Sequence, residues 1–137
     1  MKSSFNNLSV AFKNHATNNP EKFFIIIDNE KFYKYSDVNN KINQICRYFN
    51  SLHLKPGDII SAVFNNNIEY IAFYIASLRY GTVFNPYPFT LDPKDISKYI
   101  NLINPAILFC EDQHYSVLNQ MTNCITKLIK KDTIKKM

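Results

Sequence analysis

The sequence has 137 residues, a formal net charge of +5 and a hydrophobic fraction of 46%. This length favours one domain, and the apolar fraction is normal for a globular core. The longest aliphatic and aromatic run, FFIII, is far shorter than the roughly 20 apolar residues of a membrane-spanning helix. The first residues, MKSSFNNLSVAFKNH, contain no continuous apolar run, so we expect no signal peptide. We therefore expect a cytoplasmic protein with no membrane partner.

Most of the positive charge lies at the C-terminus. The segment KLIKKDTIKKM carries a net charge of +4, which leaves only +1 for the rest of the chain. A short lysine-rich end is most often a solvated tail, so no nucleic-acid partner is expected. We expect a domain over residues 1–123 and a weakly structured tail over residues 124–137. The cysteines and histidines are scattered and contain no CxxC, so no metal site is expected.

The first part of the chain predicts one helix and two strands. Apolar residues at helical spacing between Leu8 and Ala16 predict a helix, and Pro20 follows its end. The segment KFFIIIDNEKFYKY predicts two short strands joined by a turn at residues 28–30. A long amphipathic helix is expected over residues 36–52, with Ser36 as its N-cap and Asp37 in its first turn.

The middle of the chain alternates strands and helices. The run IISAVF is apolar without alternation, which predicts a strand buried on both faces of a parallel sheet. A helix over Ile68–Tyr80 follows, with Asn67 as its cap and Gly81 as its stop. TVFNP, AILFC and CITKLI predict further strands, and residues 92–104 and the segment YSVLNQM predict helices. This order predicts the α/β class, with a mostly parallel sheet flanked by helices.

The helix over Ile68–Tyr80 is apolar nearly all round. Such a helix is normally buried on every side, whereas one small sheet covers a single side. We therefore expect Tyr70, Phe73 and Tyr74 to lie partly exposed or to be covered by another copy of the chain. This helix is the expected surface for self-association or for another partner.

The residues show no evident catalytic apparatus. The chain has two glycines, Gly57 and Gly81, so both GxxxxGK[ST] and GxGxxG are excluded. The pair Glu111 and Asp112 ends a predicted strand, where ligands bind in open α/β sheets, although a solvated loop explains it better. We expect no catalytic, cofactor-binding or metal-binding residue in this chain.

Several motifs follow each other in a specific order. KYSDV looks like a Thr-Tyr-x-Glu-Leu motif, and KPGDII is similar to Lys-x-Gly-Asp-x-Val. In NIEY, Asn67, Glu69 and Tyr70 match the three named residues of Asn-x-x-Glu-Tyr. ASLRYGTVFNPYP resembles Ala-x-x-x-x-Gly-Ala-x-x-x-Pro-x-x-Pro, with Thr82 in place of the small Ala and Pro88 one residue early. These motifs belong to the AMP-forming acyl and aminoacyl ligases, which include acyl-CoA synthetases, luciferases and the adenylation domains of peptide synthetases. The residues at scaffold positions of this pattern are Tyr35, Asp37, Gly57, Asp58, Asn67, Glu69, Gly81, Pro86 and Pro88.

The resemblance runs from about Phe5 to Asp112 and implies an incomplete N-terminal portion of the family's large domain. It implies a complete enzyme that uses ATP and Mg²⁺ to activate a carboxylic or amino acid as an acyl-adenylate and then forms a thioester. The family's phosphate loop, its Tyr-x-x-Thr-Glu motif, its ribose-binding aspartate and the lysine of its mobile domain have no counterpart here. The resemblance therefore implies a chain that is inactive alone and whose partner is the remainder of the ligase or a complementing subunit.

Several interpretations stay open. The chain fits a truncated reading frame, a degenerating gene, one piece of a split enzyme or an excised segment. The alternative function is a non-catalytic protein-interaction module that binds through Ile68–Tyr80. A basic RNA-binding or membrane-binding protein is the weakest interpretation, because it depends on the tail alone.

Overall fold

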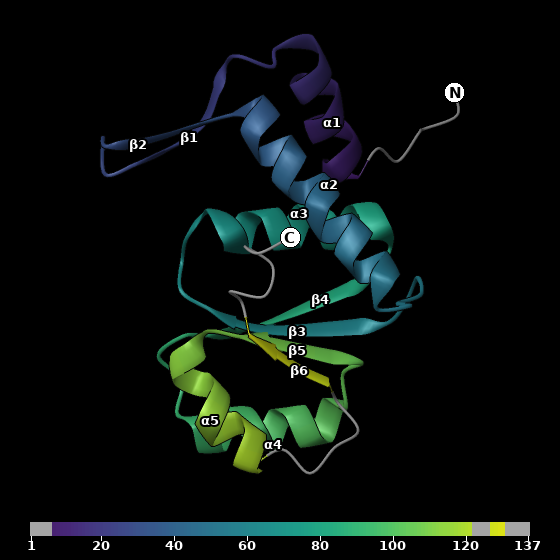
Figure 1. The fold of residues 1–137 in the computed structure, drawn as a ribbon, viewed down its shortest axis with the longest axis vertical. Helices are drawn as coiled ribbons and strands as arrows, with labels where there is room; N and C mark the ends of the chain where they lie inside the picture. The colour runs from purple at the N-terminus through teal and green to yellow at the C-terminus, as the bar shows by residue number, and fades with distance from the viewer. Residues whose placement is uncertain (1–6, 122–126, 131–137) are drawn as a thin grey trace.

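The computed structural model describes residues 7–121 and 127–130. Apart from two consecutive strands near the N-terminus, helices and strands alternate along these residues (Figure 1). In chain order they are α1 (Leu8–Asn18), β1 (Phe23–Ile27), β2 (Lys31–Lys34), α2 (Tyr35–Ser51), β3 (Ile59–Phe64), α3 (Ile68–Tyr80), β4 (Val83–Pro88), α4 (Pro93–Ile103), β5 (Ile107–Cys110), α5 (Asp112–Met121) and β6 (Lys127–Lys130).

The described strands form two sheets. β1 and β2 pair as an antiparallel hairpin, whereas the other four strands form a sheet in the order β4-β3-β5-β6. All pairs in this second sheet are parallel. The predicted fold class, α/β with a mostly parallel sheet flanked by helices, is confirmed.

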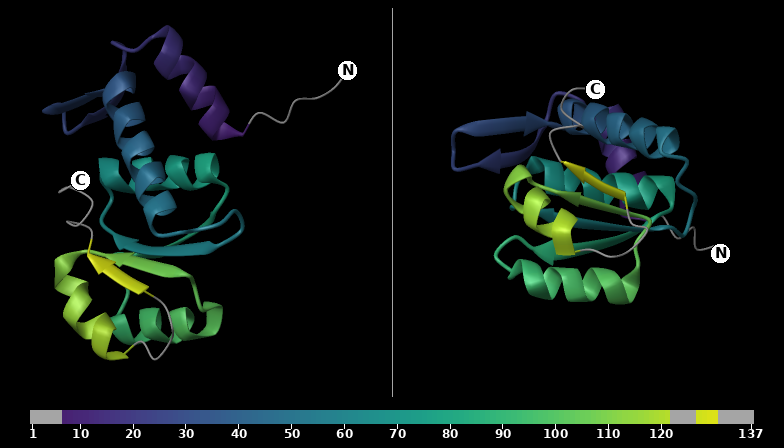
Figure 2. Two further views of the ribbon diagram at one scale, coloured as in Figure 1. Left: turned by 45° about the vertical axis from the view of Figure 1, so that its right-hand side comes forward. Right: turned by 60° about the horizontal axis from the view of Figure 1, so that its bottom comes forward.

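Helices cover both faces of the parallel sheet. α2 and α3 lie on one face, α4 and α5 lie on the other, and α1 packs against α2 and α3 (Figure 2). Successive residues of β3 enter different cores: Ala62 faces the α2–α3 side, whereas Val63 faces the α4–α5 side. This explains the apolar run without alternation. No helix within the described residues is long and apolar enough to cross a membrane.

Helix α3 is packed between the sheet and a second layer made of α1 and α2. This second layer explains why α3 is apolar nearly all round. The expectation that Phe73 is partly exposed is wrong, because its exposed fraction is 1%. Tyr70 is half-buried and Tyr74 is 41% exposed, as expected for these two rings.

The ends of α2 and α3 are held by side chains. Ser36 is not the N-cap of α2, because the helix begins one residue earlier and Lys34 occupies the cap position. Asp37 reaches back, and its Oδ2 accepts a hydrogen bond from the Lys34 N–H at 3.1 Å. Asn67 caps α3 as predicted: its Oδ1 accepts from the Tyr70 N–H at 3.1 Å.

Two glycines meet at the amino ends of β3 and β4. The Gly57 N–H donates to the Gly81 carbonyl at 2.8 Å, and both residues have a φ of +90°. A Cβ atom on Gly81 would lie 3.3 Å from Pro56 Cβ, whereas a Cβ on Gly57 would meet nothing within 4 Å. Gly81 also ends α3 in a left-handed conformation, as predicted.

Strand β4 forms one edge of the parallel sheet. The Val83 N–H donates to the Asp58 carbonyl at 2.9 Å, so the odd-numbered residues of β4 direct their N–H groups toward β3. Pro86 and Pro88 occupy alternate positions, whose N–H would point away from the sheet. Because proline has no N–H, these residues leave the free edge with few donors for another strand.

Strand β6 lies inside the lysine-rich segment. It pairs in parallel with β5, and Ile129 is 6% exposed in the core. These four residues therefore belong to the sheet, which agrees with the strand predicted from CITKLI and differs from a weakly structured tail over residues 124–137. Residues 124–126 and 131–137 of that predicted tail lie outside the described residues.

Candidate functional site

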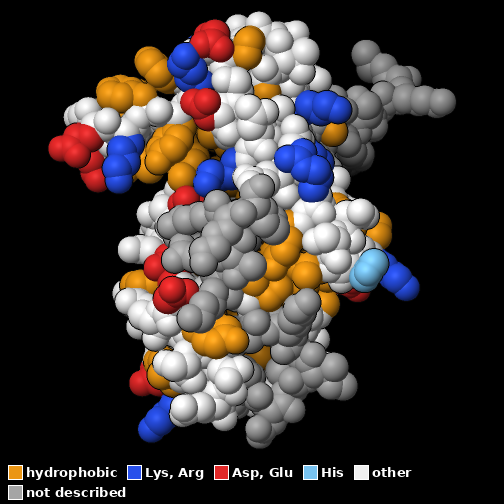
Figure 3. All heavy atoms as spheres, viewed as in Figure 1, with side chains coloured by type: hydrophobic (Ala, Val, Ile, Leu, Met, Phe, Trp, Pro, Cys, Tyr) orange, Lys and Arg blue, Asp and Glu red, His pale blue; other side chains and the backbone are white. Residues whose placement is uncertain are grey.

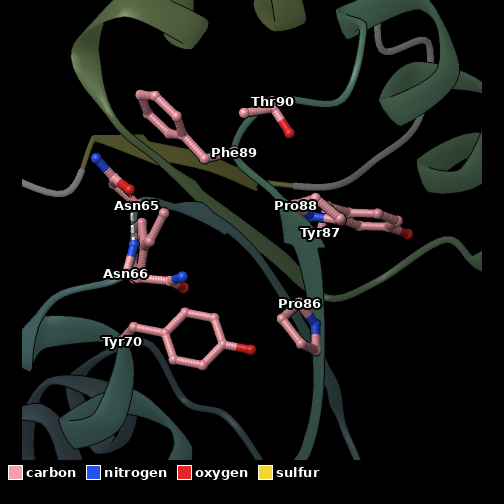
Figure 4. A pocket seen from close by; sticks show the side chains of 9 residues that line it. Asn65, Asn66, Tyr70, Pro86, Tyr87, Pro88, Phe89 and Thr90 are labelled. Atoms are coloured by element: carbon pink, nitrogen blue, oxygen red, sulfur yellow. Dashed lines mark hydrogen bonds between the residues drawn. The ribbon is translucent and has the colours of Figure 1, made fainter.

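A cavity of about 450 Å³ lies at the carboxyl ends of β3 and β4 (Figure 4). β3 leads into α3 on one face of the sheet, whereas β4 leads into α4 on the opposite face. Two adjacent parallel strands whose connections leave to opposite faces open a crevice between their loops. In open α/β sheets ligands bind at this switch point, so the crevice is the candidate site.

Neutral side chains form the two walls of the crevice. Figure 4 shows the ring of Tyr70 reaching across from the β3–α3 wall toward Pro86 on the opposite wall. The ring of Tyr70 also packs edge-on against Phe84, with centroids 5.6 Å apart. The walls comprise Asn65, Asn66 and Tyr70 on one side and Pro86, Phe89 and Thr90 on the other.

Glu111 holds the loop that forms one wall. Its Oε1 accepts a hydrogen bond from the Asn65 N–H at 3.1 Å, which ties the end of β5 to the end of β3. Its neighbour Asp112 lies in the first turn of α5, where a carboxylate is favourable. The predicted pair is therefore divided: Glu111 supports the crevice wall, and Asp112 begins a helix.

His114 supports the other wall. Its ring packs edge-on against Phe89, with centroids 4.9 Å apart, and the residue is 8% exposed. Among the described residues its Nδ1 is buried without a hydrogen-bond partner. In the sequence His114 is one of three scattered histidines, and its contact with Phe89 cannot be predicted because the two residues are distant in the chain.

The predicted scaffold residues lie in several parts of the fold. Pro86 and Pro88 line the crevice. Asn67 positions Tyr70 through the α3 cap, and Glu69 joins α3 to α2 through an ion pair with Lys41 at 3.3 Å.

The other scaffold residues lie away from the crevice. Gly57 and Gly81 meet at the amino ends of the strands, and Asp58 closes the adjacent turn by accepting from the Lys55 N–H at 2.8 Å. Asp37 completes the start of α2. The ring of Tyr35 packs in an aromatic cluster, 4.9 Å from that of Phe24 between centroids.

We expect Asn67→Ala to lower the free energy of unfolding by about 1 kcal/mol, because the variant loses the N-cap hydrogen bond of α3. Urea denaturation would measure the change. Asn67→Ser retains a capping oxygen and is the matched control, with an expected loss of a few tenths of a kcal/mol. Equal losses in the two variants would contradict a capping role.

Perturbed ionisable groups lie between α2 and α3. Burial raises the pKa of the Cys46 thiol, against the opposing effect of the Arg79 and Arg47 charges. Burial also lowers the pKa of Arg79, whose guanidinium donates to Asn43 Oδ1 at 2.6 Å and Asn39 Oδ1 at 3.0 Å. These contacts join the two helices that cover one face of the parallel sheet.

The described residues do not fit ATP and Mg²⁺. No group of three His, Cys, Asp or Glu side chains gathers within residues 7–121 and 127–130. The crevice lining contains no lysine or arginine to meet a triphosphate. The glycines lie at the opposite end of the strands, and neither belongs to a phosphate-binding loop. No step of nucleotide chemistry is therefore assigned to these residues.

The family model described as AMP-binding enzyme matches residues 12–136, and this chain belongs to that family. The resemblance inferred from the motifs is thereby confirmed. A search of curated proteins found no match.

Several solved structures share the fold of this chain. The crystal structure of VinN matches with a TM-score of 0.84 and 16% identity, over 93% of this chain and 32% of VinN. The N-terminal domain of FACL13 from Mycobacterium tuberculosis matches with a TM-score of 0.85 and 15% identity, over 96% of this chain and 35% of that chain.

A third structure is NpsA-ThdA, an artificially fused adenylation-PCP di-domain from Klebsiella oxytoca. It matches with a TM-score of 0.81 and 15% identity, over 93% of this chain and 24% of that chain. The chain thus spans about a third or less of the length of these structures. At these identities the similarity concerns the fold.

Proposed function

We propose that this chain supplies the N-terminal part of an ATP-dependent ligase. The complete enzyme would activate a carboxylic or amino acid as an acyl-adenylate, release pyrophosphate and pass the acyl group to a thiol. Family membership supports the class of enzyme. The observation that carries the role of this chain is the crevice at the β3–β4 switch point, whose neutral walls would form one side of the acyl site.

The chemistry of adenylation explains why this chain would be inactive alone. A carboxylate oxygen must attack the α-phosphorus while the triphosphate is held, so positioning and charge neutralisation carry most of the catalysis. A glycine-rich loop, a lysine and a metal-binding carboxylate usually provide them. These groups, and with them ATP and Mg²⁺, would belong to the remainder of the ligase or to a complementing subunit, with the whole enzyme in the cytoplasm.

We expect the purified chain to catalyse no carboxylate-dependent exchange of pyrophosphate into ATP. The assay would contain ATP, Mg²⁺ and a panel of carboxylic and amino acids, and a complete AMP-forming ligase would serve as the positive control. Exchange above background that a single substitution such as Tyr70→Ala abolishes would contradict this prediction. It would show that the chain is a complete small enzyme.

Complementation tests the positive part of the proposal. If a downstream reading frame encodes the phosphate loop, its product mixed with this chain is expected to restore exchange. Tyr70→Ala, which removes a ring from the crevice wall, is expected to raise the KM for the carboxylate. Leu102→Ala is the matched control, because this side chain is 80% exposed on α4. An unchanged KM in the Tyr70 variant would contradict a role of the crevice.

The alternative function, a non-catalytic module that binds a protein through Ile68–Tyr80, has less support. α1 and α2 cover much of α3, and Phe73 is buried in the core. The helix therefore offers a partner only the exposed ring of Tyr74 and half-buried side chains such as Tyr70 and Ile71.

A further inference from the structure

The β1–β2 hairpin extends away from the body of the molecule and exposes apolar side chains (Figure 1, Figure 3). Phe23, Ile26 and Phe32 are 52%, 51% and 50% exposed. The rings of Phe23 and Phe32 lie 5.3 Å apart between centroids, and Ile26 pairs directly with Phe32 across the two strands. We call these three residues the hairpin patch.

The hairpin has little support of its own. Its sheet contains two strands among the described residues, and an isolated two-stranded hairpin is marginally stable in water. Its other face carries half-buried side chains, such as Tyr33, that pack against the main core. A second apolar surface over the hairpin patch would supply the missing packing, since contiguous exposed apolar groups mark interaction sites.

The charges around the hairpin patch suit a second copy of the same hairpin. The turn carries Asp28 and Glu30 together with Lys31 at the start of β2, a net charge of −1. The base carries Lys22 and an ion pair between Lys34 and Glu21 at 2.6 Å, a net charge of +1. Asp28, Glu30 and Lys22 make no ion pair within the described residues. If two hairpins pack antiparallel, each acidic turn lies beside the basic base of the other copy.

We propose that this chain self-associates as a two-fold dimer in which the hairpin patch of one copy packs face to face on that of the other. A two-fold interface is self-complementary, so one patch with opposite charges at its two ends is sufficient. Three half-exposed side chains per copy form a small interface, and the dimer is therefore weak and dependent on concentration. The proposal does not depend on the ligase function.

Sedimentation equilibrium of the full chain over a wide concentration range tests the proposal. The wild-type chain is expected to change from monomer to dimer as its concentration rises. Ile26→Lys and Phe32→Lys are each expected to weaken the dimer by about tenfold or more, which corresponds to about 1.4 kcal/mol. Leu102→Lys replaces an 80% exposed side chain on α4 and is the control that keeps wild-type association.

Three results would overturn the proposal or its geometry. A wild-type chain that stays monomeric at its highest soluble concentration would exclude self-association. Dimers that persist in both hairpin variants, with melting temperatures like the wild type, would place the interface elsewhere. Glu30→Lys is expected to weaken the dimer because it sets a cation beside Lys22 of the other copy, and an unchanged affinity would exclude the antiparallel arrangement.

Discussion

Phe73→Ala is expected to lower the free energy of unfolding by about 3–5 kcal/mol. The ring packs against those of Phe49, Phe64 and Phe109, with centroids 5.8, 5.0 and 4.8 Å away. The substitution leaves a cavity at the point where α2, α3 and the sheet meet. Since domains are stable by roughly 5–15 kcal/mol, this loss is a large share of the total and urea denaturation would show it directly.

The adjacent residue provides the matched control. Tyr74 lies on the same helix but is 41% exposed, so Tyr74→Ala is expected to cost much less than Phe73→Ala. Phe73→Leu, which keeps most of the buried volume, is expected to lie between these two variants. Similar losses at positions 73 and 74 would contradict the packing of α3 between the sheet and the outer helices.

Gly81→Ala is expected to lower the free energy of unfolding by about 2 kcal/mol, and Gly57→Ala by about 1 kcal/mol. Both residues have a φ of +90°, so an alanine is strained at either position. Only at Gly81 does the new Cβ also approach Pro56 Cβ to 3.3 Å. The two variants therefore separate the effect of backbone strain from that of steric contact at two glycines that are hydrogen-bonded to each other.

Chemical denaturation of the two glycine variants would measure this difference. A larger loss at Gly57 than at Gly81 would contradict the close approach between Pro56 and the end of α3. Gly81→Asn tests the conformational part, because asparagine adopts positive φ more readily than alanine. The loss of stability in Gly81→Asn is therefore expected to be smaller than that in Gly81→Ala.

Local signals were sufficient to predict most elements. Strand β3 was predicted over Ile59–Phe64, its observed range, because an unbroken apolar run lies between a turn and a helix cap. The hairpin was predicted because two apolar segments flank a polar turn, and Asp28 and Asn29 indeed adopt positive φ there. These features depend on residues that are close together in the chain.

The environment of α3 could not be predicted in the same way. Its apolar surface indicated that something covers the helix, but the residues that cover it belong to α1 and α2, which come earlier in the chain. The sequence gives no sign of where those helices pack. Phe73 was therefore expected on a surface, whereas it lies at the centre of the larger core.

The crevice was missed for a related reason. Asn65, Asn66 and Thr90 look like ordinary turn and cap residues, and Phe89 follows a proline. Their proximity depends on the order of the strands and on the opposite directions in which α3 and α4 leave the sheet. Neither property can be read from local spacing, although Pro86 and Pro88 were singled out for the geometry of one wall.

The two sheets differ in how their strands are connected, and their strands are therefore expected to pair at different rates during folding. The strands of the hairpin are joined by a turn at residues 28–30, whereas each pair in the parallel sheet is separated by at least one helix. Hairpins form in about 1–10 μs, and distant pairings follow more slowly because a longer loop must close first. The two apolar hairpin strands can therefore meet, transiently, before the core that anchors them is complete. During refolding at high protein concentration, we expect encounters between such half-formed chains to compete with completion of the sheet and to lower the yield of native protein.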